Sequence, residues 1–425
     1  MANSLLKQIA VQFADGVGEL DDQLIMSKNV DKFESSGEEF QRSNDTIWRP
    51  RQNIAISNSG MDATSAFSTA SSVQLGVPAN LGYSRFAVIK LDGKELRDRL
   101  TKGTLVKSAI REIASYINGA VTDAAALQLT NTIKRTTAAT GLDDLVLADA
   151  LLTTTGVTMY DRKAAFNAYD YNGVVSNLGA KETLAGSPQT AWAKARFGET
   201  AGFEIFKADY TSRLTAAAGV TVTLTGQVDA WDPVATTTQS DGSVTPKENR
   251  YQTVGITVTS GTVKVNDRFT IGGAGLVNSV HGIRKVDTGQ KKTFVITEIV
   301  TGAGGTGTVK ISPPIIIGST QGQLQYQNVS SLPVSGAALT FLNTVAAPVN
   351  LFWQKNCIEL IPGKYEIPDG MGVQSLTATT ESGMPITMSY SFNNSTMTME
   401  GRIDAVFGVC VNEPENGGII LFNQS

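Results

Sequence analysis

The chain has 425 residues, of which 41% are hydrophobic and 17% charged, and its formal net charge is −4. This length allows two or three domains, or one domain with a large insertion. The negative net charge argues against a dedicated nucleic-acid binder, because such proteins usually carry a surplus of basic residues. The two cysteines, Cys357 and Cys410, fit neither a disulfide framework nor a zinc-binding spacing, and we interpret both as buried apolar residues.

The N-terminal part is predicted to contain a short helix followed by an extended polar segment. Residues 3–14 place Leu5, Leu6, Ile9 and Phe13 on one side of such a helix. The segment lacks a basic region leading into an apolar core, so it is not a secretory signal. No apolar run approaches the roughly 20 residues that cross a bilayer. We therefore expect a protein made in the cytoplasm, without contact to a membrane.

Residues 46–57 and 71–78 are predicted to form two strands joined by a long polar loop, Asn58 to Ala70. This hairpin has little core of its own, although a large aromatic residue, Trp48, lies at its start between arginines. An isolated hairpin is marginally stable, so we expect other parts of the protein or neighbouring copies to cover it.

The strongest helical pattern follows, from about residue 104 to 134. Apolar residues recur there at spacings of three and four, as on one face of a helix: Val106, Ile110, Ile113, Ile117, Ala120, Ala124 and Leu127. Such a helix of about 30 residues is about 45 Å long. Two further helices are predicted at Asp143–Thr153 and around Pro188–Phe197.

From about Gly219 the sequence consists of short β-branched runs separated by Gly, Pro and Asp. No helix is predicted there before about Val334, and the spacing favours a compact β-barrel or sandwich. Its apolar alternation includes Val220, Val222, Phe269, Ile271, Phe294 and Ile296. Near residue 345 the sequence again shows the mixed α and β patterns that precede the β domain. The sequence therefore predicts an α+β fold that is interrupted by a β domain over residues 218–343.

No motif predicts catalysis. The glycines of "GAGGTG", Gly302–Gly307, match a dinucleotide-binding pattern but are followed by a strand instead of a helix, so we interpret them as a hairpin turn. The only histidine, His281, has no cysteine near it in sequence. We expect no enzyme, cofactor or metal site. Two alternatives stay open at this point: an enzyme on an α+β fold, and a β-rich phage tail or adhesion protein.

Several sequence segments, in the same order along the chain, resemble segments of the major capsid (coat) proteins of short-tailed temperate phages of enteric bacteria. The most specific are "RSNDTIWRP" around Trp48 and "LFWQKNCIELIPGKYEIP" with Phe352 and Trp353. The stretches "KLDGKELRD", "FNAYDYNGVVSNL" and "AGFEIFKADY" also have counterparts there. The resemblance covers nearly the whole chain. In the β domain it lies mainly in the general pattern of short β-branched runs and less in specific motifs.

The resemblance implies the tailed-phage capsid fold of the Hong Kong ninety-seven type. Its parts would be an N-terminal arm (1–45), an extended hairpin loop and its base (46–85), a core of peripheral and axial domains with a long spine helix (86–217 and 344–425), and the inserted β domain. Members assemble with a scaffolding protein into an icosahedral procapsid with a portal at one vertex. The shell then expands as double-stranded DNA is packaged, with only weak non-specific contact between coat and DNA.

The resemblance also suggests site residues. Asp15 falls where the family has an acidic residue that meets a basic scaffold helix. Trp48 would anchor the hairpin, with Arg49 and Arg51 facing carboxylates of the same or an adjacent subunit; an ordinary buried tryptophan is the alternative. The loop Asp232–Arg250 would reach across twofold axes between capsomers through its charges, unless it is only a solvated loop. Those charges are Asp241, Lys247, Glu248 and Arg250.

Overall fold

The computed structural model describes residues 4–33, 46–57, 60–62, 72–92, 95, 99–179, 199–273, 276–365, 367, 373–380 and 383–425. The chain divides into two compact units. Unit 1 comprises Met1–Ile47, Ala79–Thr122 and Ile358–Cys410, and unit 2 comprises Trp48–Pro78, Asp123–Cys357 and Val411–Ser425. Within the described ranges, no helix combines the length and apolar character needed to span a bilayer. The helix expected around Pro188–Phe197 lies outside the described residues.

The sheet of unit 1 is built around one long strand, β25. The strand order is β1 (Asp31–Lys32), β22 (Ile358–Gly363), β25 (Thr398–Val411), β24 (Pro385–Asn393) and β23 (Gln374–Thr379), and β4 (Tyr83–Asp92) also pairs with β25. The antiparallel β4–β25 ladder runs from Asp92 opposite Thr398 to Tyr83 opposite Phe407. The rings of Tyr83 and Phe407 stack with their centres 5.3 Å apart.

Helix α1 (Ser4–Gln23) packs against helix α4 in unit 1, and the short α2 (Ile25–Lys28) follows it. The N-terminal helix is therefore longer than residues 3–14. Its buried face includes Phe13, Val17 and Leu20. A Cβ on Gly16 would lie 2.5 Å from Cδ1 of Ile110 in α4, so a larger residue there would require the end of the Ile110 side chain to move.

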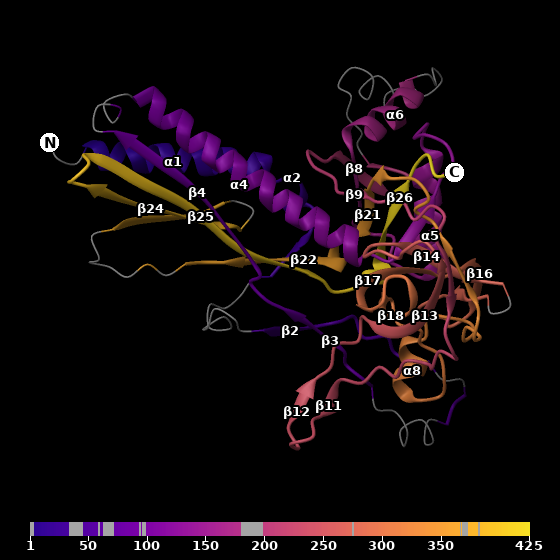
Figure 1. The fold of residues 1–425 in the computed structure, drawn as a ribbon. Coiled ribbons are helices and arrows are strands. Elements are labelled where there is room, and N and C mark those ends of the chain that lie inside the picture. Colours follow the sequence, from indigo (N-terminus) through magenta and orange to yellow (C-terminus); the bar gives the residue numbers. More distant parts are fainter. Residues whose placement is uncertain are drawn as a thin grey trace. The chain divides into compact units, whose positions relative to one another are not determined.

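Helix α4 (Arg99–Gln128) is the long helix labelled in Figure 1. The predicted apolar stripe is confirmed, because all of its members are buried except Leu127, which is half-buried. The predicted extension to residue 134 is wrong, because Asn131–Lys134 forms strand β5 and pairs with β26. The stripe ends where the chain must leave the helix to join a sheet.

The main sheet of unit 2 has the order β5, β26 (Gly417–Leu421), β21 (Asn350–Gln354), β6 (Arg162–Phe166), β8 (Phe203–Lys207) and β7 (Glu199–Thr200). Helices α5 (Asp143–Thr155) and α6 (Ala168–Gly179) share one apolar core with the sheet face that carries Phe352. The helix predicted at Asp143–Thr153 is thus confirmed. Trp353, on the other side of β21, is fully buried and meets Phe206 edge to face at 5.7 Å.

The β domain is a closed barrel that begins and ends at a short two-stranded stem. The stem pairs β9 (Arg213–Leu214) with β20 (Ala347–Pro348) in antiparallel fashion. The barrel order is β10 (Thr221–Leu224), β13 (Gln252–Ser260), β18 (Gly305–Ser312), β17 (Thr293–Thr301), β14 (Arg268–Gly272) and β19 (Ala338–Phe341). Its first and last strands, β10 and β19, also pair, with Val222 opposite Leu339.

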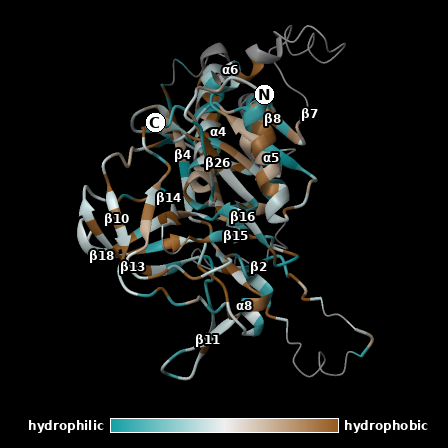
Figure 2. Ribbon diagram, turned by 90° about the vertical axis from the view of Figure 1, so that its right-hand side faces the viewer, coloured by the Kyte–Doolittle hydropathy of each residue, from teal (hydrophilic) through white to brown (hydrophobic). Residues whose placement is uncertain are grey.

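The barrel encloses its own apolar core, to which hydrophobic positions on several of the strands coloured in Figure 2 contribute. Of the predicted alternating residues, Val220 is half-buried and the others are buried. Phe269 stacks on Phe294 with ring centres 5.7 Å apart. Gly302 and Gly305 adopt positive φ angles at the turn between β17 and β18, which confirms that "GAGGTG" is a hairpin turn.

Smaller elements surround the barrel within unit 2. Helix α8 (Gln321–Tyr326) carries a capping box formed by Thr320 and Gln323, so the prediction of no helix before Val334 is wrong. The other elements are β2 (Ile47–Pro50) paired with β3 (Gly76–Ala79), β11 (Thr236–Thr238) with β12 (Val244–Pro246), and β15 (Asn278–Val280) with β16 (Asp287–Lys291). The 3₁₀ turns η2 (Lys355–Cys357) and η3 (Pro414–Asn416) also belong to unit 2.

Candidate functional site

Trp48 lies at the base of the hairpin, where β2 pairs with β3. This residue is half-buried on β2, and its ring lies across Gly76 on the paired strand β3. A Cβ on Gly76 would come 3.3 Å from Cε3 of Trp48, so a larger residue would push the indole away. The aromatic ring thus packs against the paired strand of the same chain.

Arg51 continues from β2 and binds the segment that follows β25. Its Nη2 donates to Oε2 of Glu413 at 2.7 Å, and its Nε lies 3.3 Å from both carboxylate oxygens. The backbone N–H of Gln52 donates to the same carboxylate at 2.8 Å. The two charged side chains are only 9% and 14% exposed. Arg51 therefore has an intrachain partner, the first of the two possibilities that the sequence left open.

Helix α8 of the β domain contacts the segments next to the two strands of the hairpin base, after β2 and before β3. The buried Gln325 accepts from the N–H of Val73 at 2.9 Å and donates to Oδ1 of Asn53 at 2.8 Å. The hydroxyl of Tyr326 donates to the carbonyl of Val73 at 2.9 Å. Leu75 and Tyr326 also share a small apolar cluster with Ile316. Polar and apolar contacts thus join the hairpin base to the barrel.

Glu415 is the central carboxylate of this region. It forms an ion pair with Lys292 of the barrel and accepts from Nδ2 of Asn328 at 3.1 Å. Burial by itself would raise its pKa, but Lys292, the nearby Arg51 charge and the Asn328 amide together lower the pKa below its usual value. Glu415 is therefore an ionised carboxylate that several cations share.

Lys285 reaches the same region from the turn between β15 and β16. It is half-buried and has a positive φ of 54°, unusual for a residue with a side chain. Its N–H donates to the carbonyl of His281 at 2.9 Å, while Nδ1 of the His281 ring accepts from the N–H groups of Ile283 and Arg284. Burial lowers the pKa of Lys285 to about 8, although Glu415 acts in the opposite direction.

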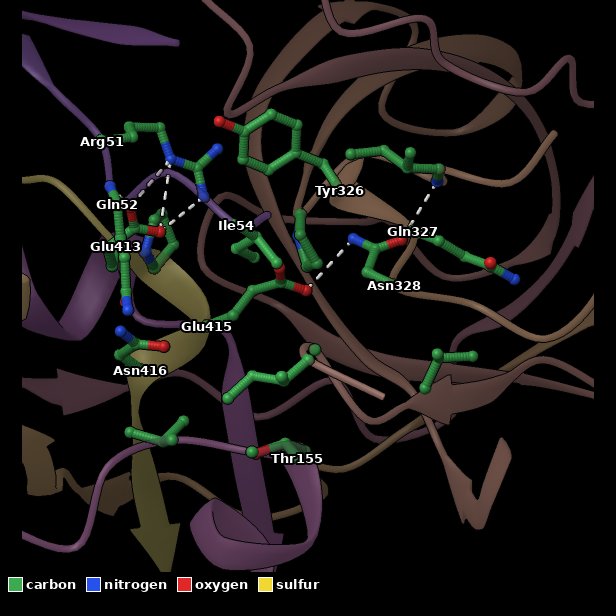
Figure 3. A pocket seen from close by; sticks show the side chains of 18 of the residues that line it. Arg51, Gln52, Ile54, Thr155, Tyr326, Gln327, Asn328, Glu413, Glu415 and Asn416 are labelled. Atoms are coloured by element: carbon green, nitrogen blue, oxygen red, sulfur yellow. Dashed lines mark hydrogen bonds and ion pairs between the residues drawn. The ribbon is translucent and has the colours of Figure 1, made fainter. Parts of the chain in front are cut away.

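These side chains line a cavity of about 110 Å³, which we call the junction cavity. Figure 3 shows Arg51 and Glu413 on one side, Gln327 and Asn328 opposite, and Glu415 between them. The turn after α5 also contributes, since Gly282 of the β domain donates to the carbonyl of Thr155 at 2.9 Å. The junction cavity therefore lies where hairpin base, barrel, α5 and the C-terminal segment meet.

Two buried arginines fasten the barrel to the end of α4. Arg268 is fully buried and donates to the carbonyls of Ala126 and Leu129. A cation there complements the negative end of the helix dipole and satisfies carbonyls that have no partner inside the helix. Burial lowers the pKa of Arg268 to about 9. Arg250 donates to the carbonyl of Val411 at 2.8 Å and to Gln128 at 3.0 Å.

The predicted intercapsomer loop is not unstructured. Residues Thr236–Pro246 form the hairpin β11–β12, which stands out from the barrel in both ribbon views (Figures 1 and 2). Asp241 is exposed at its tip and accepts from the N–H of Ser243 at 2.9 Å. The turn region is therefore the part of this segment open to a partner.

The other three charged residues predicted for the intercapsomer contact have partners within the chain. The ammonium of Lys247 lies 4.3 Å from the centre of the Trp231 ring. Glu248 pairs with Arg250 at 2.9 Å, and Arg250 is buried. The expectation that Arg250 belongs to an exposed loop is wrong, because its side chain points into unit 2 and lines the junction cavity.

Asp15 lies on the exposed face of α1 in unit 1. Glu19 and Asp22 are exposed on the same face, one and two turns further on. Glu19 forms an ion pair with Lys107 of α4. This hydrogen bond, followed by the charges of Glu19 and Asp15, raises the pKa of Lys107. The helix therefore presents an acidic face.

Sequence reasoning placed Arg51 and Arg250 at two separate surfaces, whereas the structure brings both to the junction cavity. Lys285, Glu413 and Glu415 were not predicted, because no motif marks them and Lys285 is far in sequence from the two glutamates. A positive φ at Lys285 leaves no sequence signal, and "NEPENGG" reads only as a turn. Among the described residues, no group of three or more His, Cys, Asp or Glu side chains could hold a metal ion.

A long helix, the paired strands β2 and β3, and a closed barrel inserted into an α+β core are the parts expected of a tailed-phage capsid protein. A family model described as P22 coat protein, gene protein 5, matches residues 1–423. The chain belongs to the P22 coat protein family and is a bacteriophage coat protein.

Solved structures of other phage proteins are similar to parts or most of the chain. The capsid structure of the cyanophage P-SCSP1u matches with 10% identity and a TM-score of 0.43, covering 93% of this chain and 86% of that chain. A structure titled Mycobacterium phage Che8 matches with 9% identity and a TM-score of 0.43, covering 92% and 89%. The CUS-3 coat protein I-domain matches with 35% identity and a TM-score of 0.22, covering 30% and 98%.

Proposed function

We propose that this coat protein assembles in the host cytoplasm, on a scaffolding protein, into an icosahedral procapsid of hexamers and pentamers. A portal protein would occupy one vertex, and the shell would expand as double-stranded DNA enters. The observation that supports this most is the family match over residues 1–423. The net charge of −4 is compatible with weak, non-specific contact to DNA, because a strongly basic lining would hold the genome.

The acidic face of α1 is the proposed scaffold-binding surface. Asp15, Glu19 and Asp22 are exposed there at successive turns, and Phe13 and Val17 on the opposite face are buried. A basic helix of the scaffold would contact several carboxylates at once. An exposed ion pair contributes only about 0–1 kcal/mol, but each subunit of the shell repeats it.

The hairpin β11–β12 is the proposed contact between capsomers, and its exposed Asp241 is the charge best placed for it. Lys247 and Glu248 are half-buried beside the base of the hairpin, where they would position it and contribute charge of both signs. For Trp48 and Arg51 the structure supports anchoring within the chain. We assign Arg49, which is half-buried on β2, to a contact with an adjacent subunit.

Co-expression of the chain with the scaffolding protein of the same phage tests the proposal. Negative-stain microscopy should show closed shells, and electrophoresis of purified particles should show both proteins. Asp15→Ala should lower the scaffold content, whereas Asp209→Ala, which removes an exposed carboxylate of unit 2, should not. Small monodisperse particles or fibres from the wild-type chain would contradict shell assembly, and unchanged scaffold content in Asp15→Ala would contradict the scaffold surface.

A further inference from the structure

The junction cavity holds more positive than negative charge. It is lined by four cationic side chains and two carboxylates: Arg51, Arg250, Lys285, Lys292, Glu413 and Glu415. Arg250 is balanced by Glu248, which lies outside the lining. Arg51 and Lys292 each have one of the two carboxylates. One positive charge, that of Lys285, is left without a carboxylate partner among the described residues.

Lys285 has a weak set of contacts for a half-buried ammonium. Among the described residues, the only hydrogen bond of its ammonium group goes to the carbonyl of Gln327, at 3.4 Å. The backbone nevertheless holds Lys285 in a left-handed conformation, which is unfavourable for a residue with a Cβ. Such strain is kept where the surrounding structure fixes a side chain in one place. Here the His281 ring fixes the turn.

Arg51 offers a second donor. Its Nε and Nη2 bind Glu413, whereas Nη1 has no hydrogen-bond partner within the described ranges, although the side chain is only 9% exposed. Both Arg51 and Lys285 lie close enough to Glu415 for its charge to affect their pKa values. The same carboxylate therefore lies near two cations that have donors left over.

We propose that the junction cavity binds a small oxyanion of the phosphate class, with Lys285 and Arg51 as its cationic ligands. A cavity of about 110 Å³ exceeds the space that one water needs several times over. Ammonium and guanidinium groups are the side chains that best bind such oxygens, and the amides of Gln52 and Gln327 also line the cavity. A bound oxyanion would supply the missing negative charge.

The ligand would join two parts of unit 2. Arg51 belongs to the hairpin base, and Lys285 belongs to the barrel insertion. An oxyanion bound by both would tie the base of the extended hairpin to the β domain, beside the contacts of Gln325 and Tyr326. The coat protein would then be more stable in the presence of the ligand, because only the folded chain brings these donors together.

Titration of the purified full-length chain with inorganic phosphate tests the proposal, followed by calorimetry and by the melting temperature at constant ionic strength. Lys285→Gln should weaken phosphate binding about tenfold or more, since it removes a charged hydrogen-bond donor. Arg284→Gln is the matched control, because Arg284 is exposed in the same turn and does not line the cavity. It should bind phosphate like the wild type.

Two further variants make the result specific to the cavity. Glu415→Gln should bind phosphate more tightly, since it removes the carboxylate that competes for the same cations. Arg51→Lys should bind more weakly, because a lysine lacks the second pair of donors. Absence of saturable phosphate binding by the wild type, or equal affinity in Lys285→Gln and Arg284→Gln, would overturn the proposal.

Discussion

Arg268 of barrel strand β14 donates a hydrogen bond to the main-chain carbonyl of Ala126 in the last turn of helix α4. The inserted domain thus completes the end of a helix that belongs to the core. Arg268→Met should lower the free energy of unfolding by about 1–3 kcal/mol, because it leaves buried carbonyls without a donor. Urea unfolding of the full-length chain measures this. The exposed Arg284→Met should stay within about 0.5 kcal/mol of the wild type, and an equal effect of both variants would contradict the helix-capping role.

The ion pair of Arg51 and Glu413 should contribute more to the free energy of unfolding than an exposed ion pair does. We expect a double-mutant cycle of Arg51→Met and Glu413→Gln to give a coupling of about 1–3 kcal/mol, because both side chains are nearly buried and several donors share one carboxylate. The comparison pair Lys90 and Glu400 is 60% and 46% exposed. Its coupling should be below about 1 kcal/mol. Similar values for both pairs would show that the hairpin base is held by its other contacts.

Lys285 predicts a pH dependence of stability in phosphate-free buffer. In the unfolded chain its pKa is near the usual 10.5, and in the folded chain burial lowers the pKa to about 8. Between these values the unfolded state binds more protons, so the contribution of Lys285 to stability rises with pH from about 8 to 10.5.

The rise should be on the order of 1 kcal/mol after allowance for solvent screening. Urea unfolding of the wild type and Lys285→Gln across this range measures it. The free energy of unfolding of the wild type minus that of Lys285→Gln should increase with pH. The corresponding value for Arg284→Gln should stay constant, because an exposed arginine keeps its charge. A constant difference for Lys285→Gln would mean that its pKa is not lowered by folding.

The excised segment 218–343 should fold alone. Its strands close into a barrel, and all but one residue of the buried core, Ala217, lie inside it. We expect a β-type circular dichroism spectrum and a cooperative melt. The fragment with Arg268→Met should melt at the same temperature as the unchanged fragment or higher, because the carbonyls that Arg268 binds belong to the core. A disordered spectrum would show that the barrel needs its host.

The hairpin β11–β12 gives a prediction for assembly. Asp241→Asn keeps an acceptor for Ser243 but removes the charge, so the monomer should unfold within about 0.5 kcal/mol of the wild type. With scaffold it should yield tubes or unstable procapsids, and Lys247→Ala should add to the defect. Asp209→Asn is the control, because Asp209 is also exposed and accepts from the next backbone N–H. Normal shells from the Asp241 and Lys247 double variant would exclude this contact.

The sequence predicted best those elements whose residues interact locally. The apolar stripe of α4 repeats at the helical period, and the barrel strands alternate as a half-buried strand should, so both were found from pattern alone. The end of α4 was misplaced because residues 131–134 carry no breaker. Pairing with β26, almost three hundred residues away in sequence, decides their conformation.

The junction cavity could not be predicted in the same way. Its charged residues come from the hairpin base, the β15–β16 turn and the segment after β25, and only the fold brings them together. Arg250 shows the difficulty most clearly: in a polar stretch it reads as an exposed charge, yet its fork reaches the carbonyl of Val411. Tertiary hydrogen bonds of this kind produce no periodic pattern in the sequence.

The stem of β9 and β20 places Leu214 directly opposite Ala347, so the two points where the chain leaves and re-enters the core are neighbours. More than a hundred residues between them are topologically equivalent to the loop of a hairpin. Loop-closure entropy grows only slowly with loop length, so the length of the insertion itself costs the core little, whereas the contacts of Arg268 and Arg250 tie this particular insertion to its host. A module can therefore be accommodated at this site without redirecting any strand of the core, and a different module would have to replace the donors that Arg268 and Arg250 supply.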